Sequence, residues 1–262
     1  MKKYLSQAIA SALALITFLL PGCKKAIDYL KDNPTATFCP CQIKQFSYVG
    51  LYQNDTVLYS YNAVGDPISA IRAHPGTGSP NFFFRYDQHG RFTDLLGGYG
   101  STPFERGTES WDRFFYDDQG KIMMDSAYFF PGVVDDHPTI DPRLLTSVSI
   151  IKYEYDSENR VSKASSFING SPYFTATYAY DGNGNLLGHQ YDNKINYHRT
   201  SKVWMFIDRD YSVNNPVTAT YKYNNFGLPT RIIPFEGTAE YFLLSQYNFI
   251  RGDITYLCQG SL

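Results

Sequence analysis

The stretch FFYDDQGKI, residues 114–122, shows the local pattern on which the fold depends. Tyr116 is followed by Asp117, two variable residues and Gly120. Six segments share this order of an aromatic residue, Asp or Asn, two variable residues, and Gly or Asn. They are YSYNAVG (59–65), FRYDQHG (84–90), FFYDDQG (114–120), YEYDSEN (153–159), YAYDGNG (178–184) and YKYNNFG (221–227). Because the same residue pattern recurs six times in one chain, we expect the six segments to share one local structure.

The residue types of the repeat predict a tight turn. Asp or Asn at the first turn position can accept hydrogen bonds from backbone amides ahead of it. Gly at the fourth position tolerates a positive φ, and Asn is the next best choice there. A type I turn followed by a left-handed residue makes a three-residue hairpin loop with a bulge. We therefore expect each segment to be the tip of a β-hairpin.

The residues around the turns predict strands. In Lys152–Tyr155 and Thr220–Tyr223 the tyrosines alternate with polar residues, which places the aromatic rings on one face. The 23 Tyr and 19 Phe suit a pleated, half-buried surface. The spacing of the copies is too irregular for a solenoid. We expect an all-β fold, an antiparallel meander of about a dozen strands in hairpins, curled or closed into a barrel-like sheet that protects its edges.

The fifth copy contains Asp181, Asn183 and Asn185 at alternate positions, as in a calcium loop. An EF-hand loop needs glycine at its sixth position, where this chain has Leu186, and glutamate at its twelfth, where it has Asp192. The other five copies lack the alternating pattern. We therefore favour a hairpin turn over an ion site.

The N-terminus reads as a processing signal. Lys2 and Lys3 precede an apolar run, and Leu-Pro-Gly-Cys follows at 20–23. This order predicts a lipoprotein signal peptide over 1–22 and lipid attachment, including palmitate, at Cys23. The alternatives are an ordinary signal peptide and an uncleaved anchor. We expect residues 23–37 to be a polar tether with one short helical turn, and residues 38–262 to form a single β domain.

The remaining cysteines are Cys39, Cys41 and Cys258. In an exported, oxidising setting we favour a disulfide from Cys39 or Cys41 to Cys258, which would tie the first strand to the last. The alternative is a Cys-x-Cys zinc site, but the chain has no closely spaced histidine pair to complete it.

Charge and motifs exclude several classes of function. Without Lys2 and Lys3 the chain has 21 basic and 25 acidic residues, so it carries no electrostatic footprint for nucleic acid. No HxH or HExxH spacing, nucleophile elbow, phosphate loop or dinucleotide fingerprint occurs in a suitable setting. We expect no cofactor and treat catalysis as the alternative.

Two polar clusters are weak candidates for a site. Asp135, Asp136, His137 and Asp141 lie close together between two prolines and could bind a metal or act as acid and base. A solvated loop is the commoner meaning of such a composition. We interpret Asp208-Arg209-Asp210 as an ion-pair cluster that orders a turn, and the tyrosine stripe as core rather than as a surface for sugar rings.

The repeats resemble the Y-D-x-x-G-[RKN]-[LVI] unit of YD or Rhs-type repeats, most closely at Tyr86–Phe92, Tyr116–Ile122 and Tyr180–Leu186. Tyr61 and Tyr223 are followed by Asn, and Asn159 replaces the glycine. The N-terminal signal, these hairpins and the stretch WMFIDRDYSVNNP (204–216) are also similar to an uncharacterised group of Gram-negative bacterial lipoproteins. That resemblance implies a porin-like β fold in the cell envelope and provides no catalytic residues.

Together these features predict a lipid-anchored outer-membrane protein, facing the periplasm or the surface, with a non-catalytic binding or scaffolding role. Its partners would be the membrane, through the N-terminal lipid, and a glycan or an envelope protein. A membrane-spanning barrel is disfavoured by charged outward positions. The alternative is a glycan-active enzyme with a site in the barrel mouth or the 133–143 loop. Two facing carboxylates in a cavity would favour the enzyme, and a filled interior would favour the scaffold.

Overall fold

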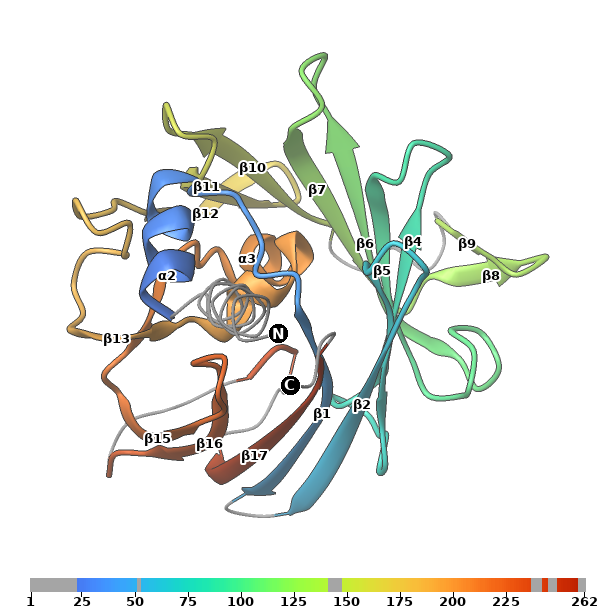
Figure 1. The fold of residues 1–262 in the computed structure, drawn as a ribbon. Coiled ribbons are helices and arrows are strands. Elements are labelled where there is room, and N and C mark those ends of the chain that lie inside the picture. The colour runs from blue at the N-terminus through green and yellow to red at the C-terminus, as the bar shows by residue number, and fades with distance from the viewer. Residues whose placement is uncertain (1–22, 51–52, 141–147, 237–241, 245–248, 259–262) are drawn as a thin grey trace, which may run out of the picture.

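The computed structural model describes residues 23–50, 53–140, 148–236, 242–244 and 249–258, so the predicted signal peptide over 1–22 lies outside it. Within these ranges thirteen strands form one antiparallel sheet, which curls around a short helix (Figure 1). The strands are β1 (Cys41–Gly50), β2 (Asn54–Tyr61), β3 (Pro67–Arg72), β4 (Asn81–Tyr86), β5 (Phe92–Gly98), β6 (Thr108–Tyr116), β7 (Ile122–Phe129), β10 (Ser149–Tyr155), β11 (Val161–Ile168), β12 (Ser171–Thr177), β15 (Ala219–Tyr223), β16 (Pro229–Pro234) and β17 (Phe249–Cys258).

The sheet order is β12-β11-β10-β7-β6-β5-β4-β3-β2-β1-β17-β16-β15. Neighbours in the sheet are mostly neighbours along the chain, which is the meander that the hairpin pattern predicts. The pairing of β1 with β17 joins the two ends of the domain. The prediction of an all-β antiparallel meander is confirmed; the sheet is curled rather than closed, because β12 and β15 remain as its two edges.

All six repeat segments form the same turn. The side-chain Oδ1 of the Asp or Asn accepts the amides of the residues two and four positions further on. The fourth turn residue has a positive φ, 77° at Gly120 and 63° at Asn159. At the fifth turn the flanking residues form one isolated bridge, Tyr180 to Leu186, instead of two full strands. The repeated residues are therefore selected by backbone geometry.

The repeat tyrosines join each hairpin to the one before it. The hydroxyl of Tyr86 donates to the carbonyl of Pro67, that of Tyr116 to Phe92, and that of Tyr155 to Ile122, at 2.7–2.8 Å. Each acceptor is the first strand residue after the preceding turn. The repeat unit thus encodes both the turn, through Asp, and the contact between hairpins, through Tyr.

A segment far along the chain fills the concave side of the sheet. It contains the 3₁₀ helix η2 (Tyr197–Thr200) and helix α3 (Lys202–Asp208). Figure 1 shows α3 inside the curve of the sheet. The Trp204 side chain is 0% exposed, and its ring meets those of Tyr59 and Phe84 edge-on, with centroids 5.6 and 5.4 Å away. We call residues 196–213 the interior segment. It is held between β13 (Tyr191–Ile195) and β14 (Asn214–Pro216), which pair with each other.

The N-terminal segment differs from the tether that we expected. Helix α2 (Cys23–Asp32) is followed by residues that fold back onto the domain, and Leu30 is 1% exposed in a cluster with Ile195, Val213 and Leu228. The apolar residues of α2 recur at helical spacing among many charged ones, so the segment reads as polar although one face is apolar. No helix in the described ranges is long and apolar enough to cross a membrane.

Candidate functional site

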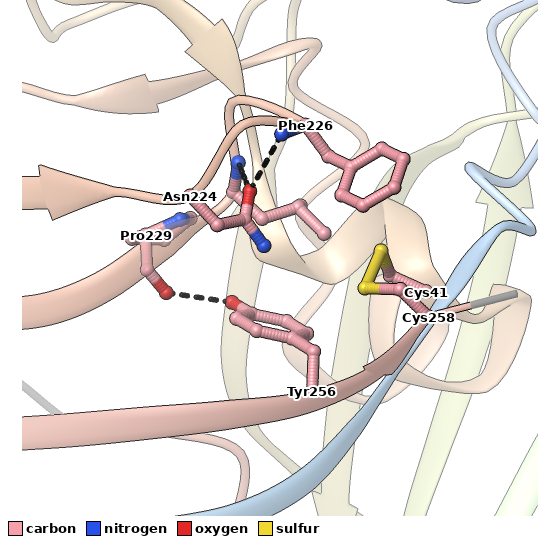
Figure 2. Close-up of a disulfide and its surroundings, with 7 residues drawn as sticks. Cys41, Asn224, Phe226, Pro229, Tyr256 and Cys258 are labelled. Atoms are coloured by element: carbon pink, nitrogen blue, oxygen red, sulfur yellow. Dashed lines mark hydrogen bonds between the residues drawn. A yellow bond between two sulfur atoms is a disulfide. The ribbon is translucent and has the colours of Figure 1, made fainter. Parts of the chain in front are cut away.

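A disulfide joins the first and last strands of the domain. Cys41 and Cys258 are directly opposed in the β1–β17 pairing, and their bond closes a separation of 217 residues. Figure 2 shows it beside the sixth repeat turn, where the Asn224 side chain accepts the Phe226 amide and Tyr256 donates to the Pro229 carbonyl. Cys39 is free and exposed, and its Sγ lies 2.9 Å from the Thr37 hydroxyl.

The fifth repeat copy is a turn in the structure. The Oδ1 of Asp181 accepts the amides of Asn183 and Asn185, at 2.8 and 3.0 Å. The Asn185 side chain turns away from Asp181 and exchanges hydrogen bonds with Asn214 of β14. The Asn183 side-chain oxygen accepts from the Lys31 ammonium at 3.1 Å. The three side chains that suggested a calcium loop therefore serve backbone amides, a lysine and a neighbouring strand.

The described part of the 133–143 loop, residues 133–140, belongs to a small hairpin on the surface. It pairs β8 (Gly132–Val134) with β9 (His137–Thr139), and Asp135 and Asp136 are the two turn residues, both at positive φ. The His137 ring lies against the Asp135 carbonyl at 2.6 Å. Asp141 lies outside the described residues. Asp135 and Asp136 are exposed at the turn tip, and neither they nor His137 line the two hollows at the turn end of the sheet.

The interior segment holds a buried cluster of charges. The His198 ring lies between Asp208, with Nε2 to Oδ2 2.7 Å, and Asp210, with Nδ1 to Oδ2 3.2 Å. Burial lowers the pKa of His198, but the hydrogen bonds and charges of the two carboxylates outweigh burial and raise it to about 9. Burial likewise raises the pKa of Asp210, but His198 and Ser212 hold it well below its usual range. An imidazolium thus joins the two ends of the segment.

Arg199, in the same segment, attaches the N-terminal residues. Its side chain is fully buried and donates to four backbone carbonyls, those of Pro34, Ala36, Tyr211 and Ser212. Burial lowers the pKa of its guanidinium to about 10. Arg199 therefore ties the chain after α2 to the interior segment.

A pair of carboxyl groups, at residues that the sequence did not single out, lies on the concave face. Asp112 of β6 and Asp125 of β7 are diagonal neighbours on this face, because Asp112 pairs with Ala127 and Asp125 with Phe114. Burial and the charge of Asp125 raise the pKa of Asp112 to about 7. Burial raises the pKa of Asp125 to about 6, against the Tyr153 hydrogen bond and the Arg209 charge. Such raised pKa values are typical of functional sites.

A cavity of about 470 Å³ opens at the end of the sheet that carries the repeat turns. Three turns, helix α3 and Thr35 enclose it. A second hollow of about 500 Å³ adjoins it across Lys202 and is lined by Cys39 and the first repeat turn. Asp112 and Asp125 line neither of these spaces. In the part of the chain that the structure describes, no cluster of three His, Cys, Asp or Glu could hold a metal ion.

Comparison with known proteins gives similarity at the level of structure. The fold is similar to a porin-like protein from Bacteroides uniformis, which is 10% identical, with 86% of this chain and 98% of that chain covered and a TM-score of 0.46. It is also similar to part of the TcdB2-TccC3-Cdc42 complex and of the Photorhabdus luminescens Tc holotoxin pore, each 12% identical with a TM-score of 0.29.

Those two matches cover 71% of this chain and 9% of the toxin chain, so this chain spans about a tenth of their length. No protein-family model matches the sequence, and no curated protein is similar enough to count as a relative. The function proposed below therefore rests on residues of this chain.

Proposed function

We propose that this protein is a lipid-anchored domain of the cell envelope, at the outer membrane, with a non-catalytic binding or scaffolding role toward a glycan or an envelope protein. The observation that carries the non-catalytic role is the filled interior. The concave side of the sheet, where a barrel-like enzyme would hold its substrate, is occupied by Trp204 and Met205, both 0% exposed.

The order of charged residues, apolar run and cysteine supports the anchor at Cys23. The Cys41–Cys258 disulfide supports an oxidising compartment outside the cytoplasm. Because the chain after α2 is held by Arg199, the domain would lie close to the lipid instead of at the end of a long linker.

Palmitate labelling tests the anchor. We expect the wild-type chain, expressed in a Gram-negative host, to incorporate labelled palmitate and to fractionate with membranes. Cys23→Ala should abolish both, whereas Cys39→Ala, which removes an exposed cysteine outside the signal, should change neither. Equal labelling of the wild-type chain and Cys23→Ala would rule out the anchor.

A second candidate, an acid–base enzyme acting on glycans, is favoured by one observation: the raised pKa values of Asp112 and Asp125. It places the chemistry on the concave face and not in the 133–143 loop. Under this alternative, glycan hydrolysis would be lost in both Asp112→Asn and Asp125→Asn while the fold persists. Absence of turnover on acidic and neutral glycans by the wild-type chain leaves the binding role as the better account.

A further inference from the structure

The cavity at the turn end is built from several parts of the chain. Its walls include the second, third and fourth repeat turns, helix α3, and Thr35 from the chain after α2. Arg199 holds the carbonyls on both sides of Thr35, so the N-terminal segment is a fixed wall of the cavity. A volume of about 470 Å³ lies within the range that accommodates small ligands.

The inner lining is apolar and aromatic. Phe92, Ile122 and Phe206 contribute carbon surface, and all three are buried in the core. Tyr116 and Tyr155 also line the space, but their hydroxyls already donate to the Phe92 and Ile122 carbonyls. These tyrosines therefore offer ring surface to a ligand. A lining of this kind suits a ring or an alkyl chain.

The charged groups of the cavity are all of one sign. Arg91, Lys121 and Lys202 line it, and no Asp or Glu occurs among the described residues that do. Asp87 pairs with Arg91 at 2.7 Å, and Asp66 lies 3.8 Å from the Lys202 ammonium, so these two cations have acid neighbours. Lys121 has no ion pair within the described part of the chain; its ammonium lies 5.5 Å from the Tyr155 ring centroid.

We propose that this cavity binds a small organic anion whose carboxylate, sulfonate or phosphate meets Lys121 while its ring or alkyl body contacts the aromatic lining. The ligand could be an acidic sugar of a glycan, whose ring carbons contact the aromatic lining, or an apolar acid. The proposal rests on the non-catalytic binding role proposed above and names its ligand class. It does not depend on the lipid anchor.

Two matched pairs of probes test whether the ligand must carry a negative charge and whether it is a sugar or an apolar acid. We would titrate the purified full chain with 2-naphthoate and neutral 2-naphthamide, and with D-glucuronate and neutral D-glucose, and follow saturable binding by ligand-observed NMR. We expect the anion of at least one pair to bind about three- to tenfold tighter than its neutral partner, as one partly exposed charged contact provides. Raising the salt concentration should reduce that preference, because the rim charges are screened.

Lys121→Met tests whether the Lys121 ammonium binds the anion, because the substitution removes the charge and keeps a side chain of similar length. The matched control is Lys152→Met, since the Lys152 ammonium also lies over an aromatic ring, that of Phe167 at 5.2 Å, but on another part of the sheet. We expect Lys121→Met to abolish the preference for the anion and Lys152→Met to retain it. Thr35→Trp should fill the cavity and weaken both members of the bound pair.

The results of these experiments distinguish the two sources of ligand and include those that would overturn the proposal. Preference for glucuronate assigns an acidic sugar, and preference for naphthoate assigns an apolar acid. Equal binding of anion and neutral probe in both pairs, no saturable binding at all, or equal losses in Lys121→Met and Lys152→Met would overturn the proposal. The palmitate labelling of the wild-type chain and its loss in Cys23→Ala do not depend on any of these results. The proposed ligand site can therefore be wrong while the proposed lipid anchor is right.

Discussion

His198 lies between Asp208 and Asp210 inside the molecule, and its charge connects the start of the interior segment to its end. The sequence indicated that Asp208-Arg209-Asp210 orders a turn through ion pairs. It did not indicate the partner, because His198 is ten residues earlier and is brought back by the η2 and α3 helices. The spacing of charged residues along the chain does not predict that two short helices reverse its direction.

This arrangement makes stability depend on pH. The pKa of His198 is raised to about 9 in the folded state, above an unfolded value of about 6.5. Its contribution is therefore fully present below pH 6.5 and is lost as the pH rises through 9. The size is on the order of 3 kcal/mol. We expect urea unfolding at pH 6, 7.5 and 9 to show this loss in the wild-type chain.

The replacement His198→Gln should be less stable at pH 6 and should lose most of the pH dependence between 6.5 and 9. His89→Gln, at an exposed turn position, serves as the control and should behave as the wild-type chain does. An identical pH profile for the wild-type chain and His198→Gln would contradict the buried imidazolium.

Substitution of Asp112 should stabilise the fold, whereas substitution of His198 should destabilise it. Its pKa, raised by burial and by the Asp125 charge, is about 7 when folded, so the stability present at low pH is lost as the pH rises through 7. Removal of the charge in Asp112→Asn should therefore stabilise the fold at pH 8, by up to about 4 kcal/mol for the full pKa shift. Thermal unfolding would measure this against Asp118→Asn, an exposed turn residue; a destabilised Asp112→Asn would show that the carboxylate has a partner in the fold.

The two aspartates differ in how readily the sequence reveals them. Asp112 shares period-two spacing with Phe114 and Tyr116, so alternation alone places it on the aromatic face. Asp125 is three residues after Ile122, which by alternation would put them on opposite faces. A bulge at Met123 shifts the count by one, because Tyr116 pairs with Ile122 but Phe115 pairs with Met124. Bulges of this kind cannot be placed without the pairing.

At the scale of elements, the hairpin tips were the most predictable part of the molecule. Each copy needs an acceptor for two amides and a residue that tolerates positive φ, and only a few residue types satisfy both needs. Helix α3 was not predicted, because seven residues that are apolar on most sides, KVWMFID, give no amphipathic period. The tyrosine contacts between hairpins were also missed, because a hydroxyl's acceptor is a tertiary property.

The turn residue Asp117 is expected to contribute more to the stability of the fold than its neighbour Asp118. Its Oδ1 accepts the amides of Gln119 and Lys121, at 2.9 and 2.8 Å. Asp117→Ala should therefore cost about 1–2 kcal/mol of unfolding free energy, because two amides lose their acceptor. Asp118→Ala, at a variable position of the same turn, should cost almost nothing. Chemical denaturation would compare the two; equal effects would show that the side-chain hydrogen bonds do not hold the turn.

At the scale of the whole molecule, the order of the strands followed from the hairpins, whereas the open edges and the docked N-terminal segment did not. The sequence left two candidates for the partner of Cys258, and the register of β1 with β17 places Cys41 opposite it. Cys39 and Cys41 are two residues apart, so alternation along a strand would place both on the same face and could not choose between them. In the structure β1 begins at Cys41, and Cys39 precedes it.

The Cys41–Cys258 disulfide closes nearly the whole domain, so its loss should be costly. Cys41→Ser should reduce the free energy of unfolding by about 3–5 kcal/mol, as expected for closure of a long loop. Cys39→Ser should leave stability unchanged, because Cys39 is free and exposed. Urea titrations of the oxidised proteins would check this, and equal stability of the two variants would contradict the assigned pairing.

The filled interior carries the proposed non-catalytic role, and Trp204 reports on it directly. The chain has two tryptophans, so Trp111→Phe leaves Trp204 as the only one. With its side chain 0% exposed against Tyr59 and Phe84, Trp204 should emit at short wavelength and resist quenching by acrylamide and iodide in the native state. Emission and quenching close to those of free tryptophan would show that the interior segment does not occupy the curl of the sheet.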